Sequence, residues 1–159
     1  AHATPGEDPP MKNISRRLAI VGCAALLAAC ASGPKHAEVQ SSIPALKASE
    51  GRLYVYRSGS MMGAAIQPNV VINGKAAGES KPGGFFFVDL APGTVEVSTS
   101  TEVEKKLTLT LDAGQTRYVR TAVGFGLMVG RVYPELVDNN VGAKEIAETS
   151  YIGKPLAKP

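Results

Sequence analysis

Few side chains in this sequence have the chemistry that nucleophilic or metal-dependent catalysis needs. The 159 residues include two Cys and two His, and none of these lies after Gly51, where regular strand patterns begin. A Ser–His–Asp or Cys–His system needs a base held rigidly beside the nucleophile, and zinc sites usually need three or four His or Cys ligands. We therefore expect no catalytic residues of these kinds, no bound metal and no cofactor.

Paired carboxylates are the remaining route to an enzyme, because glycosidases use two such groups about 5–9 Å apart. Two of the candidates precede turns, where Asp commonly accepts hydrogen bonds from nearby backbone N–H groups. Three others lie on strands or beside lysines, as solvated surface residues do. The candidates are Asp89, Asp112, Glu96, Glu102 and Glu104. We predict that the protein is not an enzyme, and a hydrolase ranks third among three hypotheses.

The segment that ends at Cys30 resembles the signal peptide of bacterial lipoproteins. Residues 11–29 contain a basic start followed by twelve apolar residues, LAIVGCAALLAA. About 20 apolar residues are needed to span a bilayer, so this stretch predicts a signal peptide and not a membrane-spanning helix. Leu27-Ala28-Ala29-Cys30 is similar to a lipobox. That resemblance implies cleavage between Ala29 and Cys30 and attachment of lipid to Cys30. The alternative is an ordinary secretory peptide with a chance Cys.

This resemblance also implies where the protein resides. Ala31 follows the lipidated Cys, and in the sorting rule that comes with the resemblance the absence of Asp there favours the outer membrane, facing the periplasm. Residues 1–10, AHATPGEDPP, are interpreted as a non-native or upstream extension. Residues 30–50 are polar and contain two prolines, which predicts a lipidated flexible tether between membrane and domain.

The domain is predicted over residues 51–150, followed by a tail over 151–159. Apolar residues alternate with polar ones in short runs, at 51–57, 94–101, 107–111 and 116–123. Asn73-Gly74 favours a type I′ hairpin turn, and the apolar run 85–90 predicts a strand covered on both faces. Residues 142–149 predict a short helix with Asn139-Asn140 as its cap. The expected fold class is all-β, a small antiparallel β-sandwich with a short C-terminal helix.

Several of these segments are similar to a bacterial lipoprotein family whose domain has no known function. The similar segments are 51–57 (GRLYVYR), 68–74 (PNVVING), 85–93 (FFFVDLAPG), 113–120 (AGQTRYVR) and 143–146 (AKEI). Residues 90–97 (LAPGTVEV) also resemble PEGA and transthyretin-like domains. The resemblance implies a small β-sandwich over about residues 51–148. These segments are strands and turns, so the resemblance implies no activity and no functional residues.

Two surfaces could bind something. If strands 52–57 and 116–123 are neighbours, arginine and tyrosine side chains share a sheet face that could bind anionic glycan or lipid headgroups. Its residues would be Arg52, Tyr54, Tyr56, Arg117, Tyr118 and Arg120. The alternative is a solvated face on which Arg packs over Tyr. The second surface is a docking loop of Phe125, Leu127 and Met128, which could contact a partner or the membrane. The alternative there is a bent strand.

The charge balance gives no support to a nucleic-acid partner, because 17 basic and 14 acidic residues give a net charge of only +3. We therefore expect no nucleic acid among its partners. The first functional hypothesis is a non-catalytic, lipid-anchored envelope protein that acts as an interaction or structural module. Its partners would be the membrane, through the lipid, and an envelope protein. The alternative is binding of an anionic glycan or lipid ligand on the Arg/Tyr sheet face.

Overall fold

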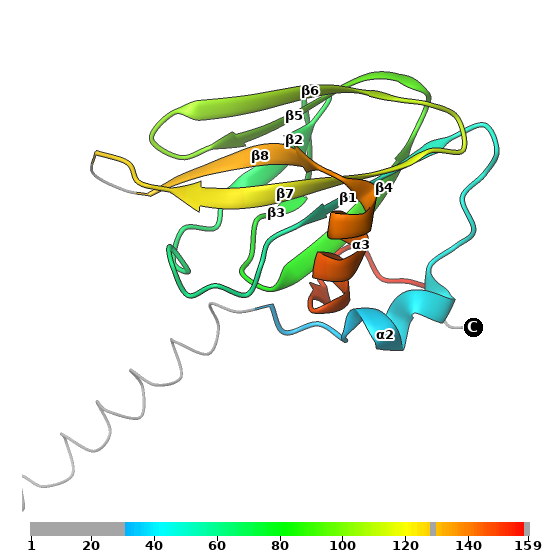
Figure 1. Cartoon of the computed structure of the whole chain (residues 1–159), viewed down its shortest axis with the longest axis horizontal. Helices are drawn as coiled ribbons and strands as arrows, with labels where there is room; N and C mark the ends of the chain where they lie inside the picture. Colours follow the sequence, from blue (N-terminus) through cyan, green and yellow to red (C-terminus); the bar gives the residue numbers. More distant parts are fainter. Residues whose placement is uncertain (1–30, 128–129, 158–159) are drawn as a thin grey trace, which may run out of the picture.

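The computed structural model describes residues 31–127 and 130–157. This part of the protein forms two β-sheets that pack face to face, and helices lie on the outer face of one of them (Figure 1). The elements in chain order are α2 (His36–Val39), the 3-10 helix η1 (Gln40–Ser42), β1 (Gly51–Tyr56), β2 (Asn69–Ile72), β3 (Lys75–Glu79), β4 (Gly84–Leu90), β5 (Gly93–Ser100), β6 (Glu104–Leu111), β7 (Thr116–Gly124), β8 (Arg131–Val137), α3 (Asn139–Ala147) and β9 (Ser150–Tyr151). The strand orders are β8-β7-β1-β4-β9 and β3-β2-β5-β6.

The main core lies between the two sheets. Successive side chains of a strand point to opposite faces, so alternate residues of each strand enter this core. Leu53 and Val55 of β1 and Val95 and Val97 of β5 are each at most 1% exposed. The all-β sandwich with a short C-terminal helix is therefore confirmed. Two strand pairs, β1 with β7 and β4 with β9, are parallel, whereas the other pairs are antiparallel.

A second apolar cluster lies on the other face of the five-stranded sheet, beneath the helices. It contains Phe85 of β4, Tyr56 of β1 and Ile146 of α3. Phe86 enters the core between the sheets, so β4 is covered on both faces, as its continuous apolar run predicts. Helix α3 begins three residues earlier than expected, after Asp138, whose side chain accepts a hydrogen bond from the backbone N–H of Asn140.

The predicted hairpin turn is present between β2 and β3. Asn73 has φ 48° and Gly74 has φ 78°, so both central residues adopt the left-handed conformation of a type I′ turn. Residues 58–67 form the loop expected after the first strand, and they include no strand or α-helix. The glycine-containing segment after β7 is the connection to β8. Pro134 lies within β8, which is an edge strand and so tolerates proline.

The segment expected to be a flexible tether packs against the domain instead, over much of its described length. Val39 is 8% exposed and belongs to the cluster beneath the helices, and the ring of His36 lies 5.3 Å from that of Phe85. The backbone of Lys35 pairs with Ser150. The apolar residues of 31–43 are too few to give a periodic pattern, but Val39 and Ile43 pack into the cluster beneath the helices. The predicted tail also packs, since Tyr151 is 8% exposed.

Candidate functional site

The parallel pairing of β1 and β7 brings five of the six predicted Arg/Tyr residues to one face of the sheet. Tyr54 lies opposite Tyr118, and Tyr56 lies opposite Arg120. The Tyr54 and Tyr118 rings stack with their centroids 5.2 Å apart. Arg52 precedes them on the same face of β1. The condition on which the face depended, that these two strands are neighbours, is met.

Arg117 lies on the opposite face of β7 from Tyr118. Val119, two residues along the strand, shares the face of Arg117 and is buried between the sheets. At the strand end Arg117 lines a separate hollow with Asp138 and Asn139. Arg117 is therefore not part of the Arg/Tyr face.

Arg52 is bound by a carboxylate. Its guanidinium donates two hydrogen bonds of 2.7 Å to Asp89 of β4, and it lies 4.5 Å from the centroid of the Phe87 ring. The hydrogen bond to Asp89 raises the pKa of Arg52. Because Arg52 is only 5% exposed and already paired, this end of the face offers little charge to an anionic ligand.

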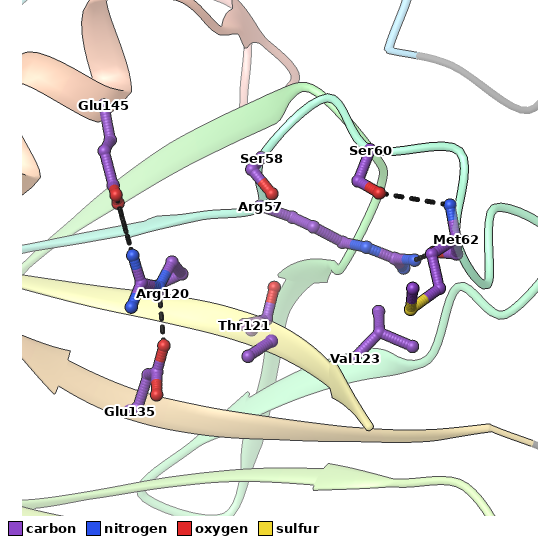
Figure 2. A pocket seen from close by; sticks show the side chains of 10 residues that line it. Arg57, Ser58, Ser60, Met62, Arg120, Thr121, Val123, Glu135 and Glu145 are labelled. Atoms are coloured by element: carbon purple, nitrogen blue, oxygen red, sulfur yellow. Dashed lines mark hydrogen bonds and ion pairs between the residues drawn. The ribbon is translucent and has the colours of Figure 1, made fainter. Parts of the chain in front are cut away.

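Arg120 is bound by two carboxylates. Its Nε donates to Glu135 of β8 at 2.5 Å, and its Nη1 donates to Glu145 of α3 at 2.7 Å (Figure 2). The hydroxyl of Tyr56 also donates to Glu145. Burial of Tyr56, followed by its hydrogen bond to Glu145, raises the pKa of its hydroxyl. Arg120 and Tyr56 thus attach α3 and β8 to the centre of the sheet.

A hollow of about 320 Å³ lies beside Arg120, between β7 and the loop that follows β1 (Figure 2). Its lining includes Ser58, Ser60 and Met62 of that loop and the two carboxylates that bind Arg120. The residues missed at sequence level are these carboxylates, Glu135 and Glu145. The sequence around Glu135 and Glu145 predicts only a strand and a helix. It does not predict that α3 packs against β7 and so brings Glu145 to Arg120.

Arg57 lines the same hollow, but its guanidinium is hydrogen-bonded to the backbone of the loop at residues 58–67. Its guanidinium donates to the backbone carbonyls of Ile66, Gly63, Ser80 and Met62, at 2.6, 2.8, 3.1 and 3.2 Å. The side chain is 2% exposed, and burial lowers its pKa. Arg57 therefore provides structure to residues 58–67, and a ligand would have to displace a backbone carbonyl to reach it.

The predicted docking loop projects from the β7–β8 connection. Phe125 is 91% exposed and Leu127 is 90% exposed. The backbone N–H of Leu127 donates to Glu102, in the β5–β6 turn, at 3.1 Å. Met128, the third predicted residue, lies outside the described residues. Two further methionines, Met61 and Met62 in the 58–67 loop, are 62% and 58% exposed.

The predicted lipidation site, Cys30, and the residue before the predicted cut, Ala29, also lie outside the described residues. Ala31 is described, and its backbone N–H donates to the carbonyl of Pro82 at 3.0 Å. In the described part of the chain, no helix is long and apolar enough to cross a membrane.

Most of the carboxylates weighed as an acid–base pair have basic neighbours. Asp89 binds Arg52, whereas Glu96 and Glu104 both lie near Lys106, at 3.1 and 3.7 Å. Glu102 lies 3.6 Å from Arg131, and Asp112 lies in the turn after β6. Among residues 31–127 and 130–157, no three His, Cys, Asp or Glu side chains are grouped as a metal would require.

Comparison with known proteins gives a family but no activity. Residues 47–132 match the model of a family described as protein of unknown function (DUF2846). The chain is also 33% identical over 145 residues to an uncharacterized protein of Haemophilus influenzae, covering 87% of this chain and 84% of that protein. No solved structure matches. The chain belongs to the DUF2846 family of proteins of unknown function.

Proposed function

We propose that this protein is a lipid-anchored protein of the bacterial envelope, attached through Cys30, that acts as a non-catalytic interaction or structural module. The observation that carries the proposal is the sequence around Cys30, in which a basic start, twelve apolar residues and a lipobox-like Leu-Ala-Ala-Cys follow one another. Location in the outer membrane, facing the periplasm, is part of the proposal. We also propose a relationship to PEGA and transthyretin-like domains, which the segment 90–97 supports.

The pairing of charges favours an interaction module over the alternative of an anionic ligand. Arg52 and Arg120, the cations of the Arg/Tyr face, are each bound by carboxylates of neighbouring elements. An anionic glycan or headgroup would have to compete with Asp89 or with Glu135 and Glu145. Exposed apolar side chains, by contrast, remain available at Phe125 and Leu127. Apolar surface of that kind suits contact with a protein or a lipid.

Lipidation is tested by metabolic labelling of the full chain with a fatty acid analogue in a bacterial host. The matched variants are Cys30→Ala and Cys23→Ala, because Cys23 lies within the apolar stretch without a lipobox before it. We expect the label in the wild type and in Cys23→Ala, and its loss in Cys30→Ala. A label that survives Cys30→Ala, or that is lost in Cys23→Ala, would show that Cys30 is not the attachment site.

The interaction role is tested by crosslinking the lipidated protein in cells, with Cys30→Ala beside it. One protein captured reproducibly by the wild type and lost in Cys30→Ala would support a membrane-apposed module and identify its partner. Capture of only glycan or lipid would favour the alternative, and the double variant Arg52→Gln/Arg120→Gln should then abolish that capture.

A further inference from the structure

Four large apolar side chains are exposed on two neighbouring connections of the fold. Met61 and Met62 belong to the loop between β1 and β2, and Phe125 and Leu127 belong to the connection between β7 and β8. We call these four residues the apolar rim. Each side chain is more than half exposed, whereas Ile66 of the first loop and Val123 at the end of β7 are only partly exposed.

The two connections contact each other at their bases. A Cβ atom added to Gly130 would lie 2.7 Å from Cδ1 of Ile66, and one added to Gly63 would lie 2.8 Å from Cγ1 of Val123. The guanidinium of Arg57 fixes the first loop through its hydrogen bonds to backbone carbonyls. The loop is therefore held in a shape that keeps its methionines outside the core.

The residue that follows Cys30 lies beside the start of the same loop. The backbone N–H of Ala31 donates to the carbonyl of Pro82. The backbone N–H of Gly83, which follows Pro82 in the chain, donates to the carbonyls of Arg57 and Ser58. A Cβ atom on Gly83 would lie 3.7 Å from Cα of Gly59. In Figure 1 the described chain begins at the lower edge of the molecule, on the side of the β1–β2 loop, and the β7–β8 connection lies farther away, at the left. A lipid on Cys30 would thus be attached next to the base of the loop that carries Met61 and Met62.

The charges around the rim are balanced. Lys105, Lys106 and Arg131 line a hollow beside Phe125, and Glu96, Glu102 and Glu104 lie near Lys106 and Arg131. A surface with this balance has no strong preference for anionic lipid. Contact with a membrane here would depend on burial of apolar side chains at the boundary between headgroups and acyl chains.

We propose that the apolar rim, Met61, Met62, Phe125 and Leu127, inserts into the surface of the bilayer that holds the lipid of Cys30. This inference depends on the proposed lipid anchor and adds to it a defined orientation: the end of the sandwich that carries the β1–β2 loop faces the lipid. The anchor brings the rim to the bilayer, and the rim prevents the domain from turning freely on its lipid.

The chain has no Trp, so one introduced indole reports on its own surroundings. The experiment uses the full lipidated chain with Phe125→Trp, reconstituted into phosphatidylethanolamine–phosphatidylglycerol vesicles with brominated acyl chains. The matched control is Val141→Trp, an exposed position on α3 that is 42% exposed. We expect strong quenching and a blue shift for the indole at position 125, and neither for that at position 141. Mass spectrometry of the same samples establishes whether Cys30 carries lipid.

The outcomes separate the rim from the anchor. Lipidated protein on vesicles with no quenching at position 125 would overturn the rim inference and leave the anchor intact. A blue shift without quenching would place the indole against protein, in a partner or a second copy, and would also overturn it. A Cys30 without lipid would refute the proposed anchor, and the rim inference with it. Quenching that appears only with anionic lipid at low salt would contradict an apolar contact.

Discussion

Arg52 of β1 and Asp89 of β4 form a bidentate ion pair, in which both hydrogen bonds are 2.7 Å long. The side chain of Arg52 is 6% exposed and that of Asp89 is 24% exposed, so the pair is largely removed from water. The guanidinium also covers the ring of Phe87. Arg52, which the sequence suggested as a ligand-binding cation, is therefore paired with a carboxylate of the domain itself.

Loss of one partner from this pair should destabilise the protein. Asp89→Asn leaves the guanidinium of Arg52 buried without its carboxylate, and we expect the free energy of unfolding to fall by about 2–3 kcal/mol. The matched control is Glu96→Gln, which breaks an exposed pair with Lys106 and should cost far less stability. Urea unfolding of the two variants measures both values. Equal losses would contradict the structural role of the Arg52–Asp89 pair.

Gly142 should resist replacement by Ala although it lies within a helix. A Cβ atom there would lie 2.4 Å from Cβ of Tyr118, so α3 would have to move away from β7. Ala is favoured over Gly in helices by about 1 kcal/mol, but overpacking costs about 1–3 kcal/mol. We expect Gly142→Ala to be less stable than the wild type in urea. Gly59→Ala, where a Cβ meets nothing within 4 Å, is the control and should be near neutral. A stabilised Gly142→Ala would show that α3 packs less closely.

His36 should make stability depend on pH. Its burial lowers its pKa below the ordinary 6.5, because the charged imidazolium loses solvation. As the pH falls below 6.5, the unfolded chain binds more protons than the folded protein, so the contribution of His36 to the free energy of unfolding decreases. Above 6.5 that contribution is constant.

The measurement is urea unfolding of the wild type and His36→Phe between neutral pH and about pH 5. The variant keeps a ring against Phe85 and does not titrate. We expect wild-type stability to fall more steeply on acidification. Parallel curves, or a wild type that gains stability in acid, would show that residues 35–39 do not stay docked on the sheet in solution.

Removal of the rim side chains at the β7–β8 connection should leave the fold intact. Phe125 and Leu127 are almost fully exposed, so Phe125→Ser/Leu127→Ser should change the free energy of unfolding by about 0.5 kcal/mol or less. The core variant Val119→Ser, at a position with no exposed surface, should cost several times more. A large loss of stability in the double variant would mean that these side chains pack against the domain.

The sequence predicted features that depend on neighbours along the chain. Asn73-Gly74 determines its own turn, because both residues accept a positive φ, and the apolar run at 85–90 predicts burial on both faces. Whether β1 and β7 are neighbours was left open by the sequence, and nothing in it predicted that they pair in parallel. The two strands are more than 50 residues apart, so no local pattern decides their register.

The partners of the Arg/Tyr face were beyond sequence reasoning for the same reason. Glu145 reaches Tyr56 and Arg120 only because α3 crosses β7 closely at Gly142. Docking of residues 31–43 depends on single side chains such as Val39, whereas composition alone favoured a tether. Arg117 was assigned to the wrong face because the expected face combined residues of both strands without regard to alternation.

The hydrogen bond between Ala31 and Pro82 limits how far the domain can extend from its attachment point. Twenty extended residues would span roughly 70 Å, enough to carry the sandwich well away from a bilayer. With Ala31 held on the domain, that distance shrinks to the single peptide unit between Ala31 and Cys30. Under the proposed anchor, any partner must therefore come to the membrane surface to be bound.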